Sequence, residues 1–290
     1  LKSKYSGSGY YNAKISPSIS VDAQNRVGIE LNINHGERVK IESFSISGSN
    51  EIPSERLLKL FKIGEADMAF VNYFTNKDLF TEAEFSQGID SMTNAYFNLG
   101  FLDFKILNVE TKLGDKKEKM SLSIQISEGM QYKVGKISFE GQLDPYSLSE
   151  LEGSILMSDG DIFNRNLVIE NIQKLTDMFA DKGFAFINVN PITSEFLDKI
   201  NITFEISSNQ KVYINRINIS GNTRTQDSVI RREIGISEGS LYSRNALKNS
   251  LRKLRRLGYF SDVQISTGKV DKMPDKIDIN FIVEETQTGS

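Results

Sequence analysis

One short pattern recurs four times along the chain and limits its possible folds more than any other feature. In each copy, an aromatic or apolar residue is followed by three others, a glycine and an aromatic residue. The four glycines are Gly9, Gly100, Gly183 and Gly258, which lie 91, 83 and 75 residues apart. Self-similarity at such a period predicts tandem copies of one small structural unit.

A second pattern recurs in register with the first. Runs of β-branched and aromatic residues end at Gly48, Gly141 and Gly221, and the four apolar residues of each run are spaced two, three and two apart. Such runs, closing on a glycine, indicate strands that end in a turn. The apolar positions are Val39, Ile41, Phe44 and Ile46; Tyr132, Val134, Ile137 and Phe139; and Val212, Ile214, Ile217 and Ile219.

The residues between these patterns predict the remaining elements of the unit. Leu247, Leu251 and Leu254 lie three or four apart, which predicts a helix that ends at the patterned glycine. A shorter helix precedes it, predicted over 226–234 in the last copy. Two alternating runs after the glycine indicate a hairpin. We therefore predict an α+β fold of βααββ units, each with a three-stranded mixed sheet covered by two antiparallel helices.

The repeats divide the chain into four parts. Residues 1–38 hold the later part of one unit (the partial repeat), followed by the first full repeat (39–130), the second full repeat (131–210) and the last repeat (211–286). In each unit the first strand is expected to lie parallel to the third. The second strand then lies at an outer edge of the sheet and carries unpaired backbone N–H and C=O groups.

These patterns resemble the POTRA (polypeptide-transport-associated) domain. The similarity is strongest in the last repeat, through INISGNTRTQDSVIRREI, SEGSLYS, LRKLRRLGYFSDV and DKIDINFIVEETQTGS, which resemble the membrane-proximal POTRA domain of Omp85-family outer-membrane assembly factors. The whole chain resembles the end of the second domain through the fifth. The second full repeat departs from the pattern, because GQLDPYS replaces the usual Gly-Asn turn.

The resemblance implies a non-catalytic scaffold in the periplasm of a Gram-negative bacterium. Residues 287–290 would begin the connection to a C-terminal outer-membrane β-barrel that this sequence does not contain. The implied partners are BamB-like and BamD-like outer-membrane lipoproteins and unfolded outer-membrane proteins, bound by strand augmentation and delivered to the barrel for insertion. A TamA-like or two-partner secretion transporter of the same family is an alternative. A basic-helix module that binds nucleic acid is an alternative from a different class.

The first candidate site is the edge strand of the first full repeat. Its apolar residues change phase near Ile106 and Leu107, which predicts a β-bulge. By resemblance, this edge receives a lipoprotein or another strand; alternatively, both faces of the strand are simply buried. The candidate residues are Phe104, Lys105, Leu107, Val109 and Thr111.

The second candidate is a basic helix in the last repeat. Residues 211–290 contain 14 basic and 9 acidic residues, whereas the whole chain has a net charge of −3. The helix could face anionic lipid headgroups or an acidic partner, or it could be a solvated surface. Nucleic acid is disfavoured because no aromatic residues interleave the basic ones. The cations are Arg244, Lys248, Arg252, Lys253, Arg255 and Arg256.

Arg231 and Glu238 form the third candidate. They flank the break between the two helices of the last repeat, and by resemblance they match positions that contact the BamD-like lipoprotein. An arginine and an acid on a loop can form charge-assisted pairs with a partner. Alternatively, Arg231 pairs within the chain with Glu238 or Asp227.

The composition argues against catalysis. The chain has no cysteine, which excludes thiolate catalysis, and its single histidine, His35, cannot by itself build a catalytic triad or a facial metal site. No phosphate-binding loop, nucleophile elbow or dinucleotide motif occurs. We therefore predict no enzymatic activity, no cofactor and no metal site.

Overall fold

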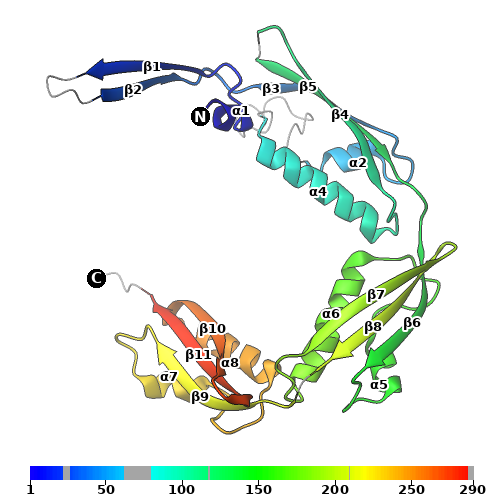
Figure 1. The fold of residues 1–290 in the computed structure, drawn as a ribbon, viewed down its shortest axis with the longest axis vertical. Helices are drawn as coiled ribbons and strands as arrows, with labels where there is room; N and C mark the ends of the chain where they lie inside the picture. The colour runs from blue at the N-terminus through cyan, green and yellow to red at the C-terminus, as the bar shows by residue number, and fades with distance from the viewer. Residues whose placement is uncertain (22–26, 62–79, 117, 209, 287–290) are drawn as a thin grey trace. The chain divides into compact units, whose positions relative to one another are not determined.

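The fold was analysed in a computed structural model, which describes residues 1–21, 27–61, 80–116, 118–208 and 210–286 (Figure 1). Residues 287–290, predicted to lead towards a barrel, lie outside the described residues, as do residues 62–79 of the first full repeat. The chain forms two compact bodies. One comprises Leu1–Lys133 with Ile162–Arg165, and the other comprises Val134–Asp161 with Asn166–Ser290.

The predicted βααββ order is confirmed in the full repeats, and the partial repeat consists of one short helix and a hairpin. The elements are α1 Lys2–Gly7, β1 Lys14–Val21 and β2 Val27–Asn34; β3 Lys40–Ser47, α2 Ser54–Leu58, α4 Glu82–Asn98, β4 Lys105–Leu113 and β5 Lys119–Ser127; β6 Lys133–Gly141, α5 Leu148–Ser154, α6 Arg165–Ala180, β7 Asn188–Phe196 and β8 Lys199–Ser207; and β9 Tyr213–Ser220, α7 Asp227–Glu233, α8 Arg244–Arg256, β10 Phe260–Val270 and β11 Met273–Glu285.

Each full repeat has a three-stranded sheet with the last strand in the centre. The strand orders are β3-β5-β4, β6-β8-β7 and β10-β11-β9. The outer strand β3 is parallel to β5 and β9 is parallel to β11, whereas β4, β7 and β10 are antiparallel to their central strands. The second strand of each full repeat therefore lies at a sheet edge, as predicted. The long helices α4, α6 and α8 each lie along the sheet of their own repeat (Figure 1).

A β-bulge explains the two-three-two spacing of the first strands. The register of β3 against β5 shifts between Ile41 and Ser43, and β9 has one extra residue where Ile214 and Ile217 pair with Ile277 and Ile279. The extra residue restores the apolar positions to the core face after the break. In the last repeat, Asp278 accepts a hydrogen bond from the bulged Arg216 N–H (3.1 Å).

The glycines that end the first strands lie where no side chain fits. Gly48, Gly141 and Gly221 have φ values of 90°, 92° and 88°. A Cβ atom at these positions would lie 2.1, 2.2 and 1.9 Å from the carbonyl oxygens of Ile126, Ile206 and Val283. The recurrent glycine is therefore required by close approach to the central strand as well as by its backbone conformation.

Apolar cores stabilise the first full repeat and the last repeat, and the last core also includes Ala180 of the second full repeat. In the first full repeat, Met92 and Tyr96 of α4 are fully buried against Ile124 and Ile126 of β5. In the last repeat, Leu247 and Leu254 of α8 join Val263, Ile279, Phe281 and other residues of the sheet. The helical spacing read from the leucines therefore marks the core face, as predicted. Among the described residues, no helix combines the length and apolar character needed to cross a bilayer.

Candidate functional site: sheet edges and charged faces

The β4 edge carries the predicted bulge. The register of β4 against β5 shifts between Ile106 and Asn108, which leaves Leu107 as the extra residue and confirms the bulge. The side chains of Leu107 and Val109 are 58% and 41% exposed, so burial of both faces of the strand is not observed. Two apolar side chains therefore lie at an edge that no other strand of the described chain pairs with.

The backbone of β4 directs hydrogen-bonding groups away from the sheet. Gly114 N–H donates to Lys119 O (2.9 Å) at the end of the hairpin. Bonded and non-bonded pairs alternate along an antiparallel ladder, so Thr111–Leu122 and Val109–Ile124 are non-bonded pairs. The N–H and C=O groups of Val109 and Thr111 therefore face the free edge. An extended peptide can add a strand there with little demand on its side chains.

Phe104 was predicted to lie at the edge, but the structure places it in the core. It precedes β4, which begins at Lys105, and its side chain is only 7% exposed. The ring stacks on Tyr96, with 4.4 Å between centroids. Phe104 is therefore a core residue rather than a partner-binding one. Lys105 and Thr111 are exposed, as expected for the edge.

In the last repeat and the second full repeat, the first-strand edge of the sheet is partly covered by the chain. In the last repeat, Ile214 N–H donates to Ser240 O (2.9 Å) and Gly239 N–H donates to Ile214 O (2.7 Å), so the loop before α8 covers part of β9. In the second full repeat, Gly160 N–H likewise donates to Val134 O of β6 (2.8 Å). These first-strand edges are partly occupied by the chain itself, whereas the second-strand edges have no such cover among the described residues.

Arg231 and Glu238 converge on one residue of β9, Ile217. Arg231 Nη2 donates to Ile217 O (3.0 Å), and Ile217 N–H donates to Glu238 Oε1 (2.9 Å). Arg231 Nε also donates to Asp227 Oδ2 (2.6 Å), which is the intramolecular pair considered above. The two side chains thus hold the bulged part of β9, beside a shallow hollow of about 250 Å³ that Ile234 and Ile236 also line.

The cations of the basic helix α8 form two groups. Two of them contact the second full repeat, which differs from the predicted outer face. Arg244 and Lys248 contact Asp177 of α6, at 3.2 and 2.7 Å, although the side chain of Lys248 remains 50% exposed. Burial acts to raise the pKa of Asp177, but hydrogen bonds from Lys248, Arg244 and Gln173 outweigh it and lower that pKa. These cations therefore join the second full repeat to the last one.

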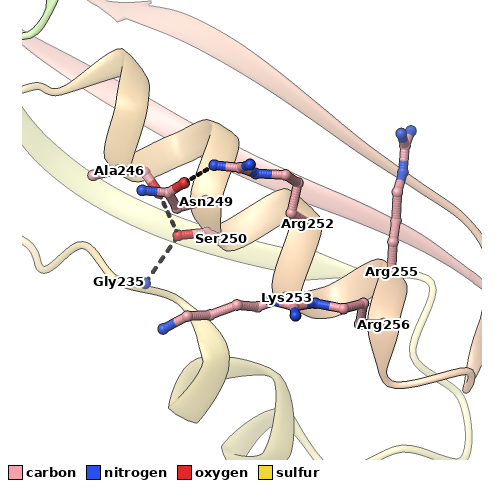
Figure 2. A pocket seen from close by; sticks show the side chains of 8 residues that line it. All are labelled: Gly235, Ala246, Asn249, Ser250, Arg252, Lys253, Arg255 and Arg256. Carbon is pink, nitrogen blue, oxygen red and sulfur yellow. Dashed lines mark hydrogen bonds between the residues drawn. The ribbon is translucent and has the colours of Figure 1, made fainter.

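The other cations of α8 line a hollow of about 770 Å³ (Figure 2). Its floor includes Ser250, whose hydroxyl accepts from Gly235 N–H (2.9 Å). Arg252 contacts Asn249, and Arg255 points away from Lys253 in Figure 2 and donates to Val263 O (3.0 Å). The cations that line the hollow are Arg252, Lys253, Arg255 and Arg256.

The contacts between the second full repeat and the last repeat were not identified from the sequence. Val212 N–H donates to Gly183 O (2.8 Å), and Tyr242 N–H donates to Val212 O (2.9 Å). Asp181 accepts from Asn245 N–H (2.7 Å) at the start of α8. The signal that could have found them is the pair of acids two and six residues before Gly183, opposite a helix that begins with cations.

The comparisons with known proteins agree with this fold. A family model described as "POTRA: Surface antigen variable number repeat" matches residues 39–129, 132–209 and 212–286. The chain therefore belongs to the POTRA family, and the resemblance inferred from its glycine and strand patterns is confirmed. The matched ranges correspond to the three full repeats.

The chain is also similar in sequence to outer-membrane assembly factors. The chain is 30% identical over 292 residues to outer membrane protein assembly factor BamA of Neisseria meningitidis serogroup B, covering 100% of this chain and 36% of that protein. It is 27% identical over 268 residues to BamA of Buchnera aphidicola, covering 92% of this chain and 43% of the relative. The chain thus spans less than half the length of these relatives and is homologous to their POTRA region.

A solved structure shows the same fold. The crystal structure of POTRA domains 3–5 of Haemophilus influenzae BamA superposes with a TM-score of 0.70 at 22% identity. The match covers 85% of this chain and 96% of that one. Tandem POTRA domains are thereby supported by the overall backbone as well as by the sequence patterns.

Proposed function

We propose that this chain is a periplasmic scaffold of an outer-membrane assembly machinery, which binds extended segments of unfolded outer-membrane proteins, or of a BamB-like lipoprotein, at the β4 edge. The observation that carries the proposal is the uncovered edge, where Val109 and Thr111 direct their backbone groups outwards beside the bulge at Leu107. Backbone pairing requires little side-chain specificity, which suits a receptor for many different clients. The BamA names of the relatives favour this function over that of a TamA-like or two-partner secretion transporter.

The experiment replaces the exposed apolar residues of the edge. The double variant Leu107→Asp, Val109→Asp is expected to lose capture of an unfolded outer-membrane protein in a pull-down, because each charge would be placed against the incoming strand. Both positions are exposed, so the circular-dichroism spectrum is expected to remain unchanged. The matched control is Ile192→Asp on β7, where the side chain is also exposed, at 46%. Undiminished capture by the double variant would refute the proposal.

We further propose that Arg231 and Glu238 contribute to the binding of a BamD-like lipoprotein. Arg231 remains 46% exposed although it binds Asp227 and Ile217, and Glu238 is exposed beside the same hollow. The Glu238→Gln variant keeps an acceptor for Ile217 N–H but removes the charge. Glu238→Gln and Glu238→Lys are both expected to weaken binding of the lipoprotein from the same genome. Unchanged affinity of both variants would exclude a role for this charge.

The cations around the α8 hollow support a third contact, with an anionic surface. Lys253 and Arg256 line the hollow together with Arg252 and Arg255, and all four are exposed. We expect the protein to bind vesicles containing phosphatidylglycerol and to lose this binding in Lys253→Glu, Arg256→Glu. Added salt is expected to weaken it, since exposed charges separated by more than about 10 Å are screened at 0.1 M salt. Binding that salt does not affect would contradict this assignment.

A further inference from the structure

Two edge strands carry proline at the same place in the repeat. Pro17 lies eight residues after Gly9, and Pro191 lies eight residues after Gly183. Each is the fourth residue of its strand, β1 or β7. The chain contains only five prolines, so their recurrence at one position of an edge strand is a specific feature. Proline lacks the N–H group that an added strand would bind.

The register of β7 shows which way Pro191 faces. Phe196 pairs with Lys199 across a two-residue turn, and the ladder continues without a shift to Pro191–Phe204. The pair that closes such a turn exchanges hydrogen bonds, and bonded pairs then alternate with non-bonded ones. Pro191 thus occupies a non-bonded pair, and its ring nitrogen faces the free edge. The outward donor at the centre of β7 is missing.

Pro17 occupies the equivalent edge in β1. It pairs with Leu31 of β2 in a ladder that also has no shift. Within an uninterrupted ladder, proline is accommodated where its nitrogen faces away from the partner strand. The free edge of β1 therefore lacks a donor at the same place as β7.

The first full repeat differs at this position. Eight residues after Gly100 the residue is Asn108, which the bulge at Leu107 places in a bonded pair with Gln125. The outward positions of β4 are then Val109 and Thr111, and both retain their N–H groups. In the last repeat the equivalent residue is Ser266 of β10, so that edge is not closed by proline.

We propose that Pro191 and Pro17 close the β7 and β1 edges to added strands and thereby favour addition at the edges without proline, of which β4 is the proposed binding edge. The inference rests on the proposed function, since it specifies which edges can take part in strand addition. Two reciprocal substitutions test the inference. Val109→Pro removes the central outward donor of β4, and Pro191→Val restores that of β7, with neither change removing a hydrogen bond from the sheet.

The absence of cysteine allows each edge to be monitored separately. Thr111→Cys reports on β4 and Thr193→Cys reports on β7, each as the only cysteine of the full chain. The probe is a peptide of about ten alternating threonine and valine residues with one cysteine, long enough to span a typical strand. Disulfide cross-linking at each reporter is measured in the parent, Val109→Pro and Pro191→Val backgrounds. Val109→Ala and Ile192→Val are controls that keep every outward N–H group.

Cross-linking in the parent is expected at the β4 reporter and not at the β7 reporter. Val109→Pro is expected to reduce the β4 signal by about tenfold, the effect of losing one backbone hydrogen bond. Pro191→Val is expected to produce a signal at β7. Circular dichroism and the two controls identify any variant that has lost its fold, and Pro191→Thr serves as a second restoring variant.

The outcomes distinguish the inference from the proposed function. No cross-link at the β4 reporter in the parent or in Val109→Ala would overturn the function proposed for that edge. Efficient cross-linking at the β7 reporter with Pro191 in place would overturn the inference. So would a β7 reporter that stays silent in both Pro191→Val and Pro191→Thr while the β4 reporter responds.

Discussion

The first and second full repeats have the same topology, but their edge strands direct different backbone groups outwards. Both β4 and β7 follow the glycine that ends a long helix, and both pair with a central strand on one side only. In β4 a bulge exposes Leu107 and turns the backbone of Val109 outwards, whereas in β7 an unshifted ladder turns Pro191 outwards. In the proposed function, this single residue decides whether an edge of this fold accepts a strand.

A second difference lies where the central strand meets the turn after the first strand. In the first full repeat, Glu128 is 7% exposed and accepts from Asn50 N–H (2.9 Å), Glu51 N–H (3.0 Å) and the Tyr96 hydroxyl (2.8 Å). The equivalent residue in the second full repeat is Ser208, whose buried hydroxyl has no hydrogen-bond partner among the residues that the structure describes. The carboxylate is therefore the element that secures the turn in one repeat and is missing from the other.

The largest effect is expected from removing this carboxylate. Glu128→Ala leaves two N–H groups and a buried hydroxyl without an acceptor, which is expected to lower the stability of the first full repeat by about 2–3 kcal/mol. Ser208→Ala, the matched change in the second full repeat, is expected to alter stability by less than about 0.5 kcal/mol. Amide hydrogen exchange of Ile124 and Ile202 in the full chain measures the stability of the two repeats. Equal losses of stability in the two variants would contradict a special role for Glu128.

Lowering the pH is expected to destabilise the first full repeat and the last repeat more than the second full repeat. Burial acts to raise the pKa of Glu128, but its hydrogen bonds from Asn50, Tyr96 and Glu51 outweigh burial and lower that pKa. Glu285 holds the same place in the last repeat, and hydrogen bonds from the Thr223 hydroxyl and Thr225 N–H lower its pKa to about 2. A carboxyl whose pKa is lower in the folded state stabilises the fold above its unfolded pKa of about 4.3 and loses that contribution as the pH falls.

The second full repeat has no carboxyl at this place, so its stability is expected to depend less on pH in this range. Amide exchange between about pH 5 and pH 2.5 is the measurement, with intrinsic exchange corrected at each pH, because the loss begins near the unfolded pKa. The first and last repeats are expected to lose protection as the pH falls, and Glu128→Gln is expected to flatten the response of the first full repeat. A larger loss in the second full repeat would contradict the assignment.

The smallest loss of stability is expected from a substitution in the long helix α6. Six residues before the patterned glycine, the second full repeat has Asp177 where the first has Asn94. Asp177→Asn removes the carboxylate that Arg244 and Lys248 contact, and is expected to destabilise the last repeat by about 1 kcal/mol. Thermal unfolding at low and high salt measures this, with Asn94→Asp as the reciprocal change. A loss that is unchanged at high salt would indicate packing rather than charge.

Much of the fold could be predicted because its constraints are local in the sequence. The patterned glycines, the leucine spacing of α8 and the alternation of β11 each depend on neighbouring residues, and together they defined the βααββ order. The bulge at Leu107 was predicted for the same reason, because apolar residues on either side of it change phase. The two-three-two spacing carried the same signal for the first strands, but we interpreted it only as a strand pattern.

The candidate site was less predictable because its interactions connect distant residues. Arg244 and Lys248 were predicted to lie on an outer face of the helix. Both contact Asp177, which precedes them by 67 and 71 residues in the sequence. Phe104 continued the apolar pattern of the edge strand, although it precedes the strand and its ring turns towards Tyr96. Arg231 and Glu238 were correctly placed around the break between helices, but their shared contact with Ile217 depends on a bulge in another strand.

The most direct test of strand addition at β4 is hydrogen exchange of individual amides in the full chain, with and without the alternating threonine–valine peptide. The amides of Val109 and Thr111, which face the free edge, are expected to exchange more slowly when the peptide binds. Those of Val189 and Thr193 on β7 are expected to be unchanged. Bound peptide that leaves Val109 and Thr111 exchanging at their free rates would contradict the account.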